Sequence, residues 1–178
     1  MSIKKDFTAP ILVLSLLCLF VSGLLAFGNK LTQPVIEGAA AQRAEAARRE
    51  IIPQAEGFVL INAEGLPKSV TDVYRTTNDV GFIFMTTTLG YGGEVKLICG
   101  IDGSGKLIKT AVLAQSETKG FGTPVFEEPH AGQFWGKDKN GIEEIQAISG
   151  ATISSNAFKK AIRDSFEAYE IISLAARK

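Results

Sequence analysis

The segment 149–155 reads Ser-Gly-Ala-Thr-Ile-Ser-Ser and joins a short apolar run to the last long helical pattern of the chain. Small residues let a ligand approach the backbone closely, and a helix start presents unpaired N–H groups and the positive end of the helix dipole. That combination suits a phosphate group. The same residue types are common at ordinary helix N-caps, so composition alone leaves both interpretations open.

The charges that follow this segment favour the phosphate. The first charged residues of the helical pattern are Lys159, Lys160 and Arg163, and the first carboxylate is Asp164. Helix starts usually carry Asp or Glu, an effect of about 0.3–1 kcal/mol per charge. Cations in the early turns are therefore expected to accompany an anion at 149–155.

The remaining residues offer little other chemistry. The chain has one histidine, His130, and two cysteines, Cys18 and Cys99, too few for a Cys/His zinc site or an iron–sulfur cluster. We therefore predict no metal site and no catalytic residue. His130 is expected to be structural, and the cysteines are expected to stay unpaired as small apolar residues. Equal numbers of basic and acidic residues, 19 of each, argue against nucleic acid as a partner.

An apolar run without charges extends over 9–27, close to the length that crosses a bilayer. A cleaved signal peptide is the alternative, but the run is longer than a usual signal core and no Ala-x-Ala site follows. We predict an uncleaved membrane helix at 9–27 after a tail at 1–8. Lys4 and Lys5 favour a cytoplasmic N-terminus, which puts the remainder of the chain outside the cytoplasm.

The segment 28–56 is predicted to be a helical stalk. A helix over 32–52 is expected, with Thr32 as its cap, Pro34 in its first turn and Pro53 beyond its end. Its apolar stripe consists mostly of alanine, so we expect it to be partly solvated.

The segment 57–178 has the pattern of an α+β domain, a mostly antiparallel sheet packed with helices. Strands are predicted at 58–61, 70–76, 80–88, 94–101 and 106–114, and an Asp-Gly-Ser-Gly turn predicts a hairpin between the last two. Alternation puts Leu107, Ala111 and Leu113 on one face of the last strand. Both faces of the sheet are expected to be covered. A helix over 153–175 closes the chain with a core-facing apolar stripe.

Ser149-Gly150-Ala151-Thr152 resembles the Ser/Thr-Gly-Ala-Thr motif of the FMN-binding domain. This domain is shared by the G subunit of the Rnf electron-transport complex and the C subunit of the sodium-pumping NADH:quinone reductase. The sequences Gly-Tyr-Gly-Gly at 90–93, Ser-Glu-Thr at 116–118 and Gly-Phe-Gly-Thr at 120–123, with one N-terminal anchor, are similar to the Rnf protein. The resemblance covers essentially the whole chain, and the length favours the Rnf protein over its larger counterpart in the quinone reductase.

The resemblance implies that FMN is joined through its phosphate to the hydroxyl of Thr152 by a separate flavin transferase. The cofactor-binding residues predicted with it are Ser149, Gly150, Ala151, Ile153, Ser154, Glu117, Thr118, Tyr91 and Gly92. Tyr91 either stacks on the flavin or is an ordinary turn aromatic. The chain departs from the family pattern at Gln146, where Asp is usual, and at Lys119, where Pro is common.

The implied function is that of a membrane-anchored flavoprotein subunit of an ion-translocating ferredoxin:NAD oxidoreductase, which relays electrons but does not catalyse the net reaction alone. The implied partners are the other Rnf subunits, the flavin transferase and the lipid bilayer. The implied location is the inner membrane, with a single pass and an extracytoplasmic FMN domain. The alternatives are the C subunit of the quinone reductase and, in a different class, a flavin-free membrane-tethered binding or assembly module.

Overall fold

The computed structural model describes residues 3–175, with side chains from Thr8 to Ala175. The first two residues of the predicted tail and the last three of the predicted domain lie outside the described residues, as do the side chains of Lys4 and Lys5. The chain divides into two compact units, one ending at Gln42 and one beginning at Arg43.

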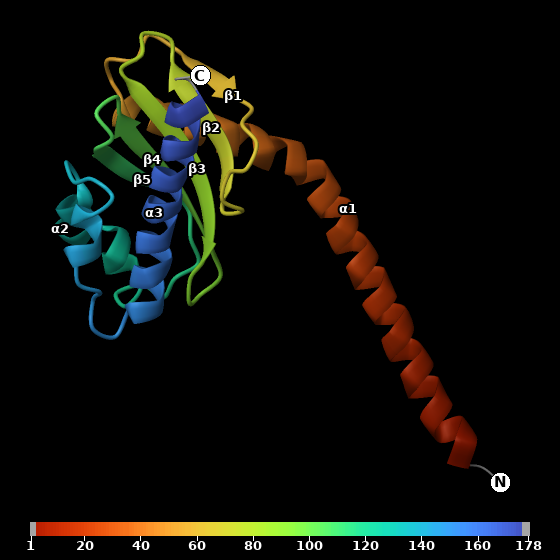
Figure 1. Ribbon diagram of the computed structural model, residues 1–178. Helices are drawn as coiled ribbons and strands as arrows, with labels where there is room; N and C mark the ends of the chain where they lie inside the picture. The colour runs from red at the N-terminus through yellow and green to blue at the C-terminus, as the bar shows by residue number, and fades with distance from the viewer. Residues whose placement is uncertain (1–2, 176–178) are drawn as a thin grey trace. The chain divides into compact units, whose positions relative to one another are not determined.

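Helix α1 (Ile3–Ile51) is continuous and contains Pro10 and Pro34 (Figure 1). The predicted helix start at Thr32 is therefore wrong. The Thr32 hydroxyl donates to the carbonyl oxygen of Gly28 (3.1 Å), four residues back, so it bonds within the helix instead of capping it. The Ala-, Glu- and Arg-rich sequence after Pro34 consists of strong helix formers, which offset the hydrogen bond that a proline removes.

Among the described residues, one helix is long and apolar enough to cross a membrane by its length and composition, the part of α1 from Thr8 to Ile51. Its large apolar side chains between Ile11 and Phe27 are exposed. Such a run of apolar surface is unfavourable in water and favourable in hydrocarbon. The helix therefore supports the prediction of a membrane anchor.

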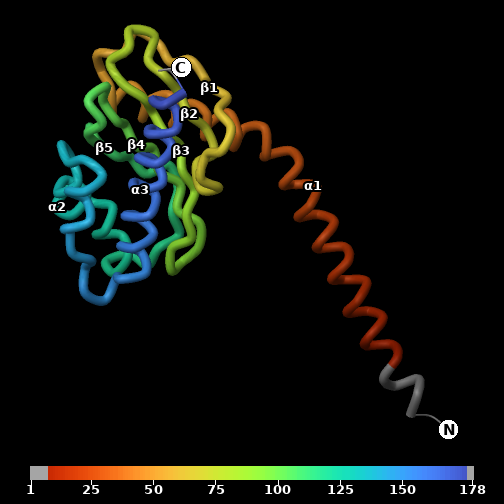
Figure 2. Tube along the Cα trace, viewed as in Figure 1, coloured from red at the N-terminus to blue at the C-terminus, as the bar shows by residue number. Residues whose placement is uncertain are grey.

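Five antiparallel strands form a single sheet in the order β1-β2-β3-β4-β5 (Figures 1 and 2). The strands are β1 (Phe58–Ile61), β2 (Val70–Thr76), β3 (Gly81–Leu89), β4 (Glu94–Asp102) and β5 (Leu107–Ala114). The predicted strands and the predicted hairpin are confirmed. In that hairpin the Asp102 carboxylate accepts hydrogen bonds from the amides of Ser104 (2.9 Å) and Lys106 (3.0 Å), which holds the turn.

One face of the sheet packs against α3 (Thr152–Ala175), as Figure 1 shows, and we term it the α3 face. Four short helices complete the covering layer: η1 (Thr123–Phe126), α2 (Glu128–Ala131), η2 (Gly132–Phe134) and η3 (Gly141–Glu144). The predicted stripe of the last helix is confirmed, because Phe158, Ile162 and Phe166 lie in this core with Leu97 and Ile101 of β4.

The opposite face, which we term the α1 face, is covered by the last turns of α1. Ala44, Ile51 and Ile52 form a second core cluster with Ile83 and Ile98 of the sheet. In Figure 2 the end of α1 and helix α3 lie on opposite sides of the strands. The prediction that both faces are covered is confirmed. The final turns of the predicted stalk are thus part of the compact unit that begins at Arg43.

The predicted alternation along the last strand is wrong. Leu107 packs in the core of the α3 face, whereas Ala111 and Leu113 pack against the α1 face. The pairing of β5 with β4 shifts register between Gly100 and Ile101 and again between Lys96 and Leu97. An extra residue at a bulge reverses which side chains point to each face, and simple alternation does not reveal it.

Candidate functional site

Helix α3 begins at Thr152, directly after a tight turn. Gly150 has a φ of +82°, in the left-handed region that favours glycine, and the amide of Ala151 donates to the carbonyl of Ile148 (3.0 Å). The Ser155 hydroxyl turns back and accepts from the amide of Ile148 (3.1 Å). The turn leaves the Thr152 side chain exposed in the first position of the helix.

The first amides of α3 have no acceptor in the part of the chain that the structure describes. Intrahelical bonding begins when the amide of Ser155 donates to the carbonyl of Ala151 (2.9 Å), so the N–H groups of Thr152, Ile153 and Ser154 remain unpaired. The first turn contains no acidic residue. Unpaired amides and the helix dipole make this end of α3 a site for an anion.

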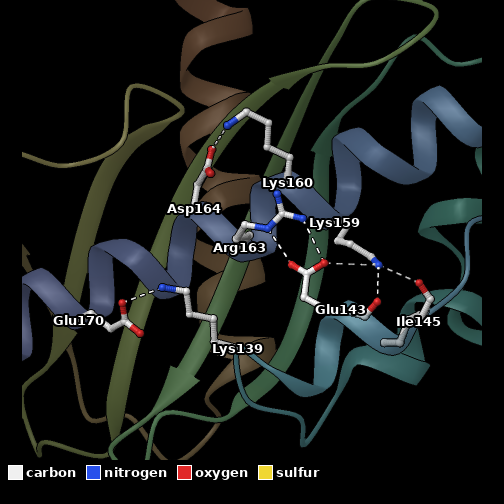
Figure 3. A network of polar contacts seen from close by, with 8 residues as sticks. All are labelled: Lys139, Glu143, Ile145, Lys159, Lys160, Arg163, Asp164 and Glu170. Carbon is white, nitrogen blue, oxygen red and sulfur yellow. Dashed lines mark hydrogen bonds and ion pairs between the residues drawn. The ribbon is translucent and has the colours of Figure 1, made fainter.

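Lys159, Lys160 and Arg163 in the early turns of α3 have partners away from the unpaired amides at its start. Figure 3 shows Arg163 and Lys159 turned toward Glu143 of η3, and Lys160 toward Asp164. Arg163 Nε lies 2.7 Å from Glu143 Oε1, and Lys159 Nζ donates to the carbonyl of Ile145 (2.8 Å). The expectation that these cations accompany an anion at 149–155 is therefore wrong. The partners of Lys159 and Arg163 lie at 143–145, far back in the sequence, and Lys160 pairs with Asp164 on the next turn of the same helix.

A pocket of about 450 Å³ opens beside the start of α3. Eight of the ten predicted attachment and cofactor-binding residues line it: Tyr91, Glu117, Thr118, Gly150, Ala151, Thr152, Ile153 and Ser154. Ser149 and Gly92 are not part of the lining. Phe121 and Gly122 line the pocket as well and were missed. Both lie in the Gly-Phe-Gly-Thr motif at 120–123, which the sequence singles out without indicating that the Phe121 ring faces the pocket.

Glu117 is the one buried charged group of the pocket. Its Oε1 accepts hydrogen bonds from the backbone amides of Tyr91 (2.8 Å) and Gly92 (3.3 Å), and its Oε2 accepts from the Ser154 hydroxyl (2.8 Å). Gly92 therefore contributes its amide to the wall of the pocket without lining it. Both carboxylate oxygens are already occupied by donors of the chain.

Thr118 shapes the loop through its backbone. Its carbonyl accepts from the amides of Phe121 (3.1 Å) and Gly122 (3.0 Å), and Gly120 has a φ of +81°. The amide of Gly120 donates to the hydroxyl of Thr123 (3.0 Å). These bonds curl the loop and bring Phe121 to the pocket.

Tyr91 and Phe121 are exposed to 72% and 69%, although both are large and aromatic. They are the exposed large aromatic residues of the described part of the compact unit from Arg43 onward, and both line the pocket. The pocket thus combines an anion-binding helix start with an opening lined by Tyr91 and Phe121, which we term the aromatic mouth. A planar aromatic ligand that carries a phosphate matches both ends.

A known protein family that binds such a ligand matches this part of the chain. Residues 90–167, which include all ten residues of the pocket lining, match the family model of the FMN-binding domain. The chain carries an FMN-binding domain.

Relatives that resemble most of the chain are G subunits of oxidoreductase complexes. The one from the Na⁺-translocating ferredoxin:NAD⁺ oxidoreductase complex of Acetobacterium woodii is 29% identical over 84% of each chain. The one from the proton-translocating complex of Clostridium ljungdahlii is 27% identical, over 83% of this chain and 84% of the relative. The one from the ion-translocating oxidoreductase complex of Methanosarcina acetivorans is 29% identical, over 94% and 96%.

The pocket of the FMN-binding domain fits the cofactor. Its volume of about 450 Å³ lies in the range of small-molecule sites, which is roughly 300–1,000 Å³. The unpaired amides of Thr152, Ile153 and Ser154 suit a phosphate, and the aromatic mouth suits the flavin ring. When bound, FMN supplies redox chemistry that no side chain of the pocket provides.

Elsewhere in the FMN-binding domain, His130 is buried and structural, as expected. Its ring nitrogens lie 2.9 Å from the carbonyl oxygen of Val125 and 3.3 Å from that of Gln146, and its ring packs against Phe134. Gln146 thus carries a backbone contact that supports the segment before Ser149. No cluster of metal-ligating side chains occurs among residues 8–175.

Proposed function

We propose that this chain is the membrane-anchored flavoprotein subunit of an ion-translocating ferredoxin:NAD oxidoreductase complex and relays electrons through FMN bound covalently at Thr152. The FMN-binding domain and the three relatives described above support this function. Because the names of two of these relatives specify sodium and protons respectively, the proposal includes ion translocation without assigning the ion.

The observation that carries the proposed attachment site is the start of α3. Thr152 presents an exposed hydroxyl beside the three unpaired amides, at the edge of the pocket. A phosphate bonded to this oxygen would be held by the amides and stabilised by the helix dipole. By contrast, the hydroxyl of Ser154 is engaged with Glu117, and that of Ser155 accepts from Ile148. Of the three hydroxyls in the first turn of α3, that of Thr152 is thus the one that remains available.

The proposed attachment is a substitution at phosphorus. The bond that forms joins Thr152 Oγ1 to the phosphorus of FMN, and the bond from phosphorus to the leaving group of an activated flavin nucleotide breaks. The hydroxyl proton departs with the leaving group, and no electrons are exchanged. We assign this step to a separate flavin transferase, because no base lies against the exposed Thr152 hydroxyl among the described residues.

The chain's own residues would hold and orient the cofactor. Gly150 and Ala151 offer a backbone without bulky side chains near the phosphate and ribityl chain. Tyr91 and Phe121 offer aromatic faces to the flavin ring, and Ile153 adds apolar surface. Attachment at the phosphate leaves the ring electronics to these surroundings.

The proposed location is the cytoplasmic membrane, with the FMN-binding domain on the extracytoplasmic side and the other subunits of the complex as partners. The apolar part of α1 supports the anchor. A reporter enzyme that works only in the cytoplasm, fused after Lys178, should be inactive. An active fusion would contradict the proposed side of the membrane.

The decisive experiment is flavin fluorescence in a denaturing gel, with the full chain co-expressed with a flavin transferase. The wild-type chain should give a fluorescent band, Thr152→Ala should be dark, and Thr152→Ser should keep the band because it retains a hydroxyl. Mass spectrometry should find the added flavin mononucleotide on the peptide that contains Thr152. A dark wild-type band would contradict covalent binding and favour a flavin-free module, and a bright Thr152→Ala band would move the attachment elsewhere.

A further inference from the structure

Glu117 joins three segments of the chain that are far apart in sequence. It lies in the loop after β5, accepts two amides from the turn between β3 and β4, and accepts the hydroxyl of Ser154 in the first turn of α3. These three segments are the walls of the pocket. A charged acceptor makes stronger hydrogen bonds than a neutral one, and a buried one holds its donors firmly.

The glycines around Glu117 leave room for its carboxylate and for little else. A Cβ at Gly90 would lie 2.0 Å from Glu117 Oε1, and a Cβ at Gly122 would lie 2.5 Å from Glu117 Oε2. Real Cβ atoms essentially never come this close to another atom. The chain therefore closes on the carboxylate from two sides, and the glycines permit the approach.

We propose that Glu117 is a positioning residue for flavin attachment and not a ligand of the flavin. Its carboxylate, the amides of Tyr91 and Gly92 and the hydroxyl of Ser154 form a unit that we term the Glu117 latch. Ser154 is two residues from Thr152, so the latch sets where the acceptor hydroxyl stands relative to the aromatic mouth. The inference rests on the proposed attachment at Thr152, although the latch itself exists without the cofactor.

Glu117→Gln distinguishes the positioning role from a direct effect of the negative charge, because glutamine keeps the shape of the side chain and lacks the charge. In Glu117→Gln, the amide oxygen can accept from Tyr91 and Gly92 while the amide nitrogen donates to the hydroxyl oxygen of Ser154. The latch would then persist without its charge. Glu117→Ala removes all three bonds and leaves the buried hydroxyl of Ser154 without its acceptor, and Ser154→Ala removes one bond.

The experiment measures amide hydrogen exchange and flavin attachment on the full chain in detergent. Glu117→Ala in the flavin-free protein should speed exchange in peptides that span 89–93 by about tenfold or more, since the bonds to a charged acceptor are lost. Flavin fluorescence per folded molecule should fall in Glu117→Ala and Ser154→Ala and should be largely retained in Glu117→Gln. The exposed Glu128→Ala serves as the control and should match the wild type in both measurements.

Two results would overturn the inference. Equal loss of fluorescence in Glu117→Gln and Glu117→Ala would mean that the negative charge itself acts on the cofactor. Unchanged exchange at 89–93 in Glu117→Ala would mean that the latch does not hold the turn. If Glu117→Ala does not fold, flavin fluorescence in Ser154→Ala and Glu117→Gln still tests the inference, because only Ser154→Ala should lose it. A wild-type chain without flavin would sink the proposed attachment, yet the exchange measurement would still test the latch.

Discussion

The α3 face and the α1 face of the sheet are both closed by apolar packing, but they differ in what else they contain. The α3 face is covered by a long helix and four short ones, and buried polar groups such as Glu117, His130 and Ser154 lie in its layer. The α1 face is covered by the last turns of α1 around Ala44, Ile51 and Ile52. The pocket therefore belongs to the layer on the α3 face, whereas the α1 face contributes a smaller apolar cluster.

The largest expected effect is in thiol labelling, which measures how often local or global unfolding exposes a buried cysteine on each face. Cys99 of β4 is fully buried on the α3 face, and burial raises the pKa of its thiol to about 12. With Cys18→Ser as background, thiol labelling of the native chain at pH 8 should be over a thousandfold slower than in denaturant, because opening costs roughly 5 kcal/mol or more.

Ile98→Cys in a Cys99→Ala background places the thiol on the α1 face instead. It should label faster than Cys99, because fewer turns of helix cover it. Equal rates would mean that the two faces open together, as one cooperative unit.

The raised pKa of the Cys99 thiol also predicts how stability depends on pH. Between about pH 9 and 12 the thiol ionises in the unfolded chain but stays protonated in the native chain. The free energy of unfolding should therefore fall as the pH rises through this range.

Phe158→Ala should break the α3 face. The Phe158 ring packs edge-on against Phe134 (5.2 Å between ring centroids) and Phe126 (5.6 Å), one turn after Ser154. The free energy of unfolding should fall by about 3–5 kcal/mol, and flavin attachment should fall with it because the helix start loosens. Denaturant unfolding and in-gel fluorescence measure the two effects. Phe158→Leu is the matched control and should lose less of both.

Ile51→Ala should destabilise the α1 face without disturbing the pocket. A Cβ at Gly100 would lie 2.2 Å from Ile51 Cγ2, so this side chain fills the space over the glycine. The free energy of unfolding should fall by about 2–4 kcal/mol, while flavin attachment per folded molecule stays unchanged. Equal losses of attachment in Ile51→Ala and Phe158→Ala would contradict the division between the faces.

Gly100→Ala provides the compensating half of a double-mutant cycle with Ile51→Ala. Alone it should destabilise by overpacking, by roughly 1–3 kcal/mol. In the double variant the new methyl group fills the space that Ile51 vacates, so the combined loss should be smaller than the sum of the single losses. Additive losses would show that the two residues do not compete for the same space.

The smallest effect is expected at Glu143, which ties η3 to α3 on the surface of the α3 face. The Arg163 guanidinium beside it lowers the pKa of its carboxyl below the ordinary value of 4.5. Glu143→Gln should cost less than about 1 kcal/mol at pH 7. A lowered pKa stabilises the fold above about pH 4.5, so the difference from wild type should disappear as the pH falls to about 3. Glu144→Gln, at an exposed position beside it, is the neighbouring control and should leave the free energy of unfolding at pH 7 unchanged.

Most of the α3 face and the pocket could be predicted because their signals are local. Alternating β-branched residues mark the strands, Asp-Gly-Ser-Gly marks the hairpin, and spacing marks the stripe of α3. The lining followed from short motifs at 90–93, 116–118 and 149–152. Phe121 lies inside the Gly-Phe-Gly-Thr motif, but nothing in the sequence says that its ring faces the pocket.

The features that could not be predicted depend on long-range contacts. The bulges of β5 follow from its pairing with β4, so the face of Leu107 is not determined by its own strand. Lys159 and Arg163 find Glu143 only once η3 packs beside α3. The alanine-rich end of α1 resembles a solvated stalk until Gly100 offers a place for Ile51.

The end of α1 also matters for anyone who wants a soluble version of this protein. A shortened chain that starts at Gly57, where the strands begin to be visible in the sequence, would lack Ile51 and Ile52 and would expose Ile83 and Ile98 to water. Such a chain is expected to aggregate. A chain that starts near Arg43 removes the apolar run but keeps the cover of the α1 face. The better place to cut therefore lies inside a helix.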